Sequence, residues 1–146
     1  MEAVILCGIQ ASGKTTLYRD RFLETHVRIS LDLLRTRHRE ACFLETCLET
    51  RQPFVVDKTN ETVEERRRYL APARAAGFTV VAYLVEVEPS TALDRNVERP
   101  ERRRVPVAGL LGTRKRLVPP SLAEGFDAVY RARPAAAGGG WEIVQS

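Results

Sequence analysis

Eight consecutive residues near the start of the chain, Gly8-Ile9-Gln10-Ala11-Ser12-Gly13-Lys14-Thr15, match the pattern G-x-x-x-x-G-K-[ST]. Glycines at these positions let the backbone curl until its N–H groups converge on a chain of phosphates. The lysine adds positive charge toward the β- and γ-phosphates, and the threonine hydroxyl suits Mg²⁺. The alternative is a tight turn before an ordinary helix. We therefore predict a nucleoside triphosphate site formed by Gly8, Gln10, Ala11, Ser12, Gly13, Lys14, Thr15 and Thr16, with Mg²⁺ at Thr15.

The segments on either side of this loop are those that a phosphate-binding loop requires. Residues 3–7 form a short, continuous apolar run, which is typical of a strand buried on both faces. Residues 14–24 carry apolar side chains at helical spacing, with charged residues between them. The pattern predicts a strand, a glycine loop and a helix in succession.

The rest of the chain continues this alternation of strands and helices. Strands are expected at 27–30, 53–57 and 79–87, and short final strands at 128–131 and 141–144, with Trp141 as a packing residue. Helices are expected from Leu31, over 40–50, over 62–76 with Thr62 as N-cap, from an N-cap at Ser90, and from Pro106 to 118. The segment 134–140, rich in alanine and glycine, is expected to be a flexible hairpin loop. Alternating units of this kind predict one α/β domain over 1–146, with a mostly parallel sheet and helices on both faces.

Composition places the chain among soluble globular proteins. It has 146 residues, 44% of them hydrophobic and 29% charged, and a formal net charge of +4. We find no signal peptide and no apolar run of membrane-spanning length, and therefore expect a cytoplasmic protein with no membrane contact. The three cysteines, Cys7, Cys42 and Cys47, lack metal-ligand spacing and are expected to be buried, reduced residues.

Ligands of parallel α/β sheets bind at the carboxyl ends of the strands, so polar residues at those ends are candidates for a site. After the second strand, Asp32 and Arg35 lie one helical turn apart. The carboxylate is suited to accept a proton from an acceptor hydroxyl, and the guanidinium to hold an anionic group with two parallel hydrogen bonds. The alternative is an acid in a first helical turn and a surface ion pair.

The third strand ends in Asp57, which is followed closely by Thr59 and Asn60. An acid in this position is placed to meet Mg²⁺ through water or to brace a catalytic arginine. Thr59 and Asn60 are candidates for substrate binding, or else form the turn into the next helix, because both residue types favour turns.

The densest positive stretch includes Arg95, Arg99 and residues 102–104. Arginines that close over a transferring phosphoryl group stabilise the negative charge that spreads over it. Pro100 and Pro106 interrupt helical structure, as a hinged lid requires. We interpret Arg95 and Arg99 as lid residues and 102–104 as a solvated basic segment.

Taken in order, these segments resemble the kinase domain of the 5′-hydroxyl polynucleotide kinases. The match includes the phosphate loop, Asp32-x-x-Arg35, Asp57-x-Thr59-Asn60 followed by Glu65-Arg66-Arg67, and Arg95-Asn96-x-x-Arg99. The segment 118–126 is similar to that of the mammalian members. Parts of this pattern are shared with the wider group of small ATP-dependent kinases, including the zeta toxins. The resemblance covers essentially the whole chain and implies a P-loop kinase domain with an arginine-bearing lid.

The resemblance also implies roles for individual residues. Lys14, Asp32 and Arg99 would be catalytic, with Asp32 as the acid that activates the acceptor hydroxyl and Arg99 on the transferring phosphate. Arg35 would hold the acceptor phosphate with support from Asp57, and Arg95 would lie nearer the nucleotide. Gln10 and Ala11 depart from the proline and glycine usual in the family. The chain has no Asp-x-Asp phosphatase motif.

The sequence thus predicts an ATP- and Mg²⁺-dependent phosphotransferase that acts on the 5′-hydroxyl of a DNA or RNA strand in nucleic-acid end processing or repair. No obligate protein partner is expected. A second reading keeps the chemistry but makes a nucleoside, sugar or antibiotic the acceptor. A third is an ATPase or nucleotide switch without an acceptor, although the Asn-Lys-x-Asp motif of a GTPase switch is absent.

Overall fold

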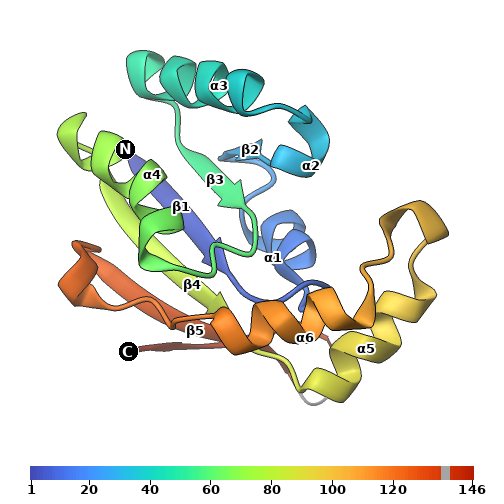
Figure 1. Ribbon diagram of the computed structural model, residues 1–146. Helices are drawn as coiled ribbons and strands as arrows, with labels where there is room; N and C mark the ends of the chain where they lie inside the picture. Colours follow the sequence, from blue (N-terminus) through green and yellow to red (C-terminus); the bar gives the residue numbers. More distant parts are fainter. Residues whose placement is uncertain (136–138) are drawn as a thin grey trace.

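The computed structural model describes residues 1–135 and 139–146, and within them the chain folds around one sheet. Its strands are β1 (Glu2–Cys7), β2 (Val27–Ile29), β3 (Phe54–Asp57), β4 (Thr79–Val85), β5 (Ala128–Pro134) and β6 (Trp141–Gln145). The sheet has six strands in the order β2-β3-β1-β4-β5-β6. All neighbouring pairs are parallel except β5 and β6, which are antiparallel. The predicted fold class is confirmed (Figure 1).

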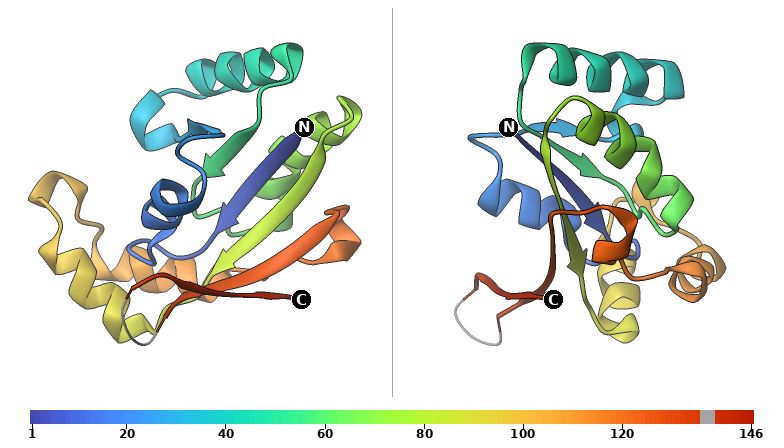
Figure 2. Two further views of the ribbon diagram at one scale, coloured as in Figure 1. Left: turned by 180° about the vertical axis from the view of Figure 1, so that it is seen from behind. Right: turned by 90° about the vertical axis from the view of Figure 1, so that its left-hand side faces the viewer.

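The central strands are apolar along their whole length because helices cover both faces of the sheet. In β1, Val4 and Leu6 face one hydrophobic core, while Ala3, Ile5 and Cys7 face the other. Helix α1 (Lys14–Arg21) packs on the first face, and α3 (Arg37–Thr50) and α4 (Val63–Ala75) pack on the second (Figure 2). This double burial explains the continuous apolar run that preceded the loop in the sequence.

The remaining helices lie toward the carboxyl ends of the strands. They are α2 (Leu31–Leu34), α5 (Pro89–Glu98) and α6 (Val107–Arg116), with a 3₁₀ turn at Glu101–Arg103 between the last two. A second 3₁₀ turn, at Leu122–Glu124, precedes β5. Helices α5 and α6 and their connection project beyond the sheet, which is the position predicted for a lid (Figures 1 and 2). None of the helices in the described part of the chain is long and apolar enough to cross a membrane.

Several local expectations are confirmed and others are wrong. The Thr62 hydroxyl accepts a hydrogen bond from the Glu65 N–H and caps α4 as predicted, but the Glu65 carboxylate accepts from Lys58 rather than completing a capping box. Ser90 is not the N-cap of α5, because Pro89 starts the helix one residue earlier. Cys42 is exposed, whereas the other two cysteines are buried. Part of the expected loop at 134–140, residues 136–138, lies outside the described residues.

A buried arginine connects the start of α4 to the segments around it. The Arg66 side chain is 0% exposed and donates hydrogen bonds to both carboxylate oxygens of Glu124, at 2.8 and 2.9 Å. It also donates to the carbonyls of Asn60 and Val118, at 2.9 and 2.8 Å. Arg66 therefore fixes the turn after β3 against two distant parts of the chain, and this turn adjoins the phosphate loop.

Candidate active site

The phosphate loop connects β1 to α1 in a conformation that depends on its glycines. Gly8 has φ of 156°, and a Cβ there would lie 2.9 Å from both the Ser12 hydroxyl oxygen and the Val85 carbonyl oxygen. Gly13, at φ of 105°, precedes the first residue of α1. Helix α1 therefore begins directly at the end of the loop, and the N–H groups of a first helical turn, which lack partners within the helix, favour an anion there.

Lys14 lies inside this loop. Its ammonium group donates hydrogen bonds to the carbonyl oxygens of Gly8, at 2.9 Å, and Ile9, at 2.7 Å. Burial lowers the pKa of Lys14 to about 8, an effect that Asp57 opposes and Arg99 reinforces. The ammonium group is thus held inside the loop by neutral carbonyl oxygens, which the charged oxygens of bound phosphates would replace.

The two residues that depart from the family pattern each have a structural consequence. Ala11 has φ of 61°, in the left-handed region where an alanine is strained and a glycine is not. The Gln10 side-chain amide donates a 2.9 Å hydrogen bond to the hydroxyl of Thr113, on α6. The loop is therefore stiffened at Ala11 and connected to the base of the lid through Gln10.

Thr15, Asp57 and Arg28 form a cluster beside the loop. The Thr15 hydroxyl and Arg28 Nε both donate to Oδ2 of Asp57, each at 2.8 Å. The Asp57 side chain is 4% exposed and that of Arg28 26%. Parallel pairing of β2 with β3 brings these two side chains to the same edge of the sheet. Asp57 thus pairs with an arginine, although not with either of the predicted lid arginines, and its predicted functional roles stay predictions.

Arg28 was not among the site residues predicted from the sequence. The signal was an arginine in the middle of a short strand, between Val27 and Ile29, where an apolar or small residue is more usual. Because strand residues alternate between faces, Arg28 lies on the opposite face of the sheet from the buried Ile29. An acid at the end of a neighbouring strand would then be its expected partner.

Thr59 and Asn60 form the turn that follows β3. The Thr59 carbonyl accepts a hydrogen bond from the Gly8 N–H at 3.1 Å. The Asn60 amide donates to the Leu6 carbonyl at 2.7 Å, and this residue is 1% exposed with φ of 45°. These contacts attach the turn to β1 and to the first residue of the phosphate loop. They agree with the alternative in which the two residues form the turn into the next helix. Substrate binding by the two residues stays a prediction.

Asp32 and Arg35 lie on the short helix α2 and its C-terminal end, and both are exposed. Neither makes an ion pair within the described residues. Arg35 has φ of 76°, which is rare for an arginine. The alternative of an Asp32–Arg35 surface ion pair is therefore wrong, and both side chains are free to meet a ligand.

The lid arginines come from α5 and its C-terminal end. Arg95 Nη1 donates to the Ser12 carbonyl at 3.3 Å, which places its guanidinium against the phosphate loop. Burial and the nearby Arg103 lower the pKa of Arg99, while Asp32 and Asp57 raise it. Both carboxylates thus favour the charged form of Arg99, whereas its burial disfavours that form. The residues at 102–104 are exposed, as predicted for a solvated segment.

Thr15 and Asp57 are the residues that fit Mg²⁺. A hydroxyl and a carboxylate oxygen lie 2.8 Å apart beside the loop, and oxygen donors are those that Mg²⁺ prefers. The described residues contain no cluster of three or more His, Cys, Asp or Glu side chains with metal-site geometry. That pattern agrees with Mg²⁺ sites, in which one or two protein oxygens act together with substrate phosphates.

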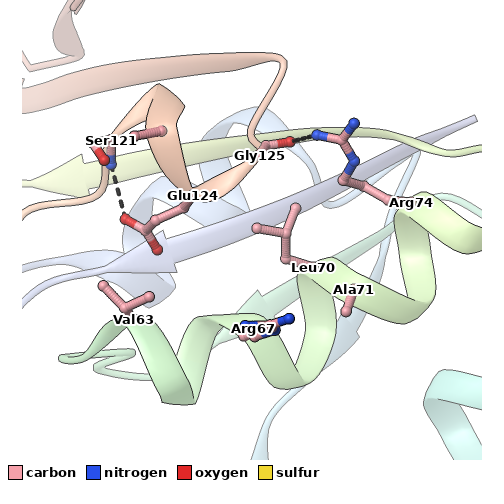
Figure 3. A pocket seen from close by; sticks show the side chains of 9 residues that line it. Val63, Arg67, Leu70, Ala71, Arg74, Ser121, Glu124 and Gly125 are labelled. Atoms are coloured by element: carbon pink, nitrogen blue, oxygen red, sulfur yellow. Dashed lines mark hydrogen bonds between the residues drawn. The ribbon is translucent and has the colours of Figure 1, made fainter.

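A separate cavity lies away from these residues. It is a groove of about 650 Å³ between α4 and the segment 121–125, shown in Figure 3. Apolar side chains such as Val63 and Leu70 line it together with Arg67 and Arg74, and Arg74 donates a hydrogen bond to the Gly125 carbonyl. No residue of the phosphate loop lines the groove, so we assign it no part in the phosphate site.

Comparison with known proteins agrees with this geometry. A sequence family described as AAA domain matches residues 4–120, from β1 through the end of α6 and just beyond. The loop, the sheet and this match together define the class of protein, a P-loop kinase-like ATP-binding domain. The chain belongs to the AAA domain family.

A curated relative and two solved structures show the range of similar proteins. The bifunctional polynucleotide phosphatase/kinase of Schizosaccharomyces pombe is 25% identical over 132 residues, which are 88% of this chain. The chain spans about a third (32%) of the length of that relative. Kti12 of Chaetomium thermophilum, solved with ADP-AlF3, is 15% identical with a TM-score of 0.68, over 88% of this chain and 87% of that one. A gluconokinase from Sinorhizobium meliloti 1021 is 17% identical with a TM-score of 0.61, over 90% and 82%. The two structures show the shared fold.

Proposed function

We propose that this domain is an ATP-dependent kinase that transfers the γ-phosphoryl group to the 5′-hydroxyl of a DNA or RNA strand. The observation that carries the proposal is the geometry of the phosphate loop, in which Lys14 is buried, with the Thr15–Asp57 hydrogen bond beside it and the lid helix in contact through Arg95 and the Ser12 carbonyl. Asp32 follows β2 and Arg99 ends α5, so both belong to segments at the same edge of the sheet. This arrangement has the groups that phosphoryl transfer needs, namely a phosphate cradle, a proton acceptor and a cation on the lid.

In the proposed reaction, the acceptor oxygen forms a bond to the γ-phosphorus while the bond to the bridging oxygen of ADP breaks. The proton of the acceptor hydroxyl passes to the Asp32 carboxylate, which is exposed and able to approach it. Lys14 and Arg99 stabilise the negative charge on the transferring group. When bound at Thr15 and Asp57, Mg²⁺ would neutralise charge on the β- and γ-phosphates.

A nucleic-acid acceptor is supported by the name of the relative that is 25% identical in sequence, and by exposed arginines beside Asp32 and on the lid. The 25% identical relative is named a polynucleotide phosphatase/kinase, and the present chain corresponds in length to only part of it. Arg35, exposed beside Asp32, is suited to hold the phosphate that follows the 5′-terminal nucleoside. Exposed arginines at 102–104 supply further positive charge on the lid.

The test is transfer of labelled γ-phosphate from ATP to a panel of acceptors. We expect label on a short strand with a 5′-hydroxyl, none on the same strand with a 5′-phosphate, and little on gluconate or a free nucleoside. Transfer to the strand should weaken as salt rises, because phosphate contacts release counterions. Efficient labelling of a small molecule, with none on the strand, would overturn the proposed acceptor and retain the kinase. ATP binding without transfer to any acceptor would overturn the kinase proposal itself.

A further inference from the structure

Two side chains that are far apart in the sequence meet at the last glycine of the phosphate loop. A Cβ placed on Gly13 would lie 3.2 Å from Cη2 of the Trp141 indole and 3.5 Å from Nη1 of Arg95. Trp141 is the first residue of β6, and Arg95 lies on the lid helix α5. An indole and a guanidinium, both flat and polarisable, therefore approach the same point of the loop.

Each of the two groups is anchored by a hydrogen bond. The Trp141 indole Nε1–H donates to Oδ2 of Asp20, on α1, at 3.1 Å. Arg95 Nη1 donates to the Ser12 carbonyl at 3.3 Å. Trp141 is only partly buried against the core beneath α1, so part of this residue remains accessible to solvent.

The sheet order indicates which part of ATP reaches this point. Asp57, the last residue of β3, and Asp32, which follows β2, belong to strands on one side of β1, whereas Trp141 lies on β6, beyond β4 and β5 on the other side. The γ-phosphate must lie toward the carboxylates where transfer takes place. A triphosphate held in the loop therefore directs its nucleoside end away from them, toward β4–β6 and Trp141.

We infer that Trp141 and Arg95 bind the nucleobase of ATP, with the indole as a stacking surface and the guanidinium as the opposing cationic face. Aromatic side chains stack on bases through their π-faces, and arginine adds a cation–π attraction. Trp141 would then have a binding role in addition to the packing role expected from the sequence. The inference rests on the ATP-binding part of the proposed function and does not depend on the acceptor.

Trp141 is the only tryptophan of the chain, so its fluorescence reports on this site without labelling. We expect ATP and ADP to change the emission of the wild-type protein, whereas inorganic tripolyphosphate, which fills the loop but has no base, should leave it nearly unchanged. If calorimetry shows that the protein is saturated with ATP while its emission is unchanged, the inference is overturned.

Calorimetry on two variants separates stacking from packing. Trp141→Leu keeps an apolar side chain but removes the aromatic face, and we expect its affinity for ATP to fall roughly tenfold or more. Its affinity for tripolyphosphate should stay within about twofold, and Trp141→Phe should restore most of the ATP affinity. An equal loss for ATP and tripolyphosphate would contradict the inference, because it would show damage to the loop. If the variants fail these tests but the protein still transfers phosphate to a strand, only the proposed base site is refuted. If the tests succeed but no transfer is found, only the kinase proposal is refuted.

Discussion

The two halves of the candidate site differ in how completely the fold has already built them. The closed half consists of the phosphate loop at 8–15, with Arg28, Asp57 and Asn60 beside it, and its polar groups are mostly buried and hydrogen-bonded. The open half consists of Asp32, Arg35 and Arg99, of which the first two are exposed and Arg99 is partly so. The same edge of the sheet thus holds a preformed anion site next to charged side chains that form no ion pair within the described residues.

This difference indicates which half of the site binds ATP and which half acts in transfer. A loop in which Lys14 and the neighbouring Asp57 are already held by hydrogen bonds is preorganised, and it loses little entropy when phosphates replace the internal acceptors of Lys14. Free side chains on a short helix and a lid become ordered only when an acceptor or a transferring phosphate supplies their partners. We therefore expect changes in the closed half to affect ATP binding and stability, and changes in the open half to affect transfer.

The largest expected effect comes from the lid. Arg99→Ala removes the cation proposed to stabilise the transferring group, and we expect kcat for phosphoryl transfer to fall about a thousandfold or more. Arg102→Ala is the matched control, because this exposed arginine is proposed to assist only the binding of the strand, so its kcat at saturating strand should be unchanged. Steady-state kinetics at saturating ATP measures both. A tenfold or smaller loss for Arg99→Ala would assign this residue to the solvated basic segment instead.

The next largest effect is on stability and comes from Arg66, which anchors the turn beside the phosphate loop. Arg66→Ala leaves the buried Glu124 carboxylate without its ion pair and the turn at Asn60 without its anchor, so we expect a loss of about 3–5 kcal/mol in unfolding free energy. Arg68→Ala, an exposed change on the same helix, should cost less than about 0.5 kcal/mol. Urea denaturation of both variants is the measurement. Similar stabilities for the two would show that the closed half does not depend on this anchor.

A pH effect follows from the pKa of Lys14, which is about 8 in the empty loop. Above that pH the free protein carries a neutral Lys14, whereas bound phosphates favour the charged form, so binding must take up a proton. The affinity for ATP should then fall by about tenfold per pH unit above the free-state pKa, until the bound-state pKa is reached. Calorimetry in buffers of different ionisation enthalpy detects both the slope and the proton uptake. A constant affinity up to about pH 9.5 would be inconsistent with a lowered pKa.

The smallest effect concerns the strained alanine of the loop. Ala11→Gly relieves a left-handed conformation that costs alanine about 1–2 kcal/mol, but it also adds about 0.5–1 kcal/mol of entropy to the unfolded chain. We expect a net gain in stability of up to about 1 kcal/mol, with ATP affinity nearly unchanged. Thermal unfolding tests this, and a lower melting temperature would mean that Ala11 makes contacts that outweigh its strain.

Much of the fold could be predicted because each local signal agreed with the overall architecture. The apolar run before Gly8 and the N-cap at Thr62 correspond to an observed strand and an observed cap. The misplaced N-cap at Ser90 shows the limit of such signals, since Pro89 suits the first helical turn as well as a serine suits a cap. The phosphate loop could be predicted because eight adjacent residues contain nearly all of its chemistry.

Contacts between distant residues could not be predicted in this way. Arg28 meets Asp57 only because β2 pairs with β3, and Trp141 meets Gly13 only because a final antiparallel strand reaches the loop. The burial of Arg66 likewise depends on Glu124, which is 58 residues away in the chain. A single sequence records these residues but not the strand order that brings them together.

The division between the two halves is tested most directly by measuring ATP binding and phosphoryl transfer on the same preparations of Asp32→Asn and Lys14→Met. For Asp32→Asn we predict an affinity for ATP within about twofold of wild type and transfer to a 5′-hydroxyl strand reduced by about 10²–10⁴-fold. Lys14→Met should lose both activities. An Asp32→Asn protein that transfers phosphate at the wild-type rate, or that loses ATP binding together with transfer, would contradict the account.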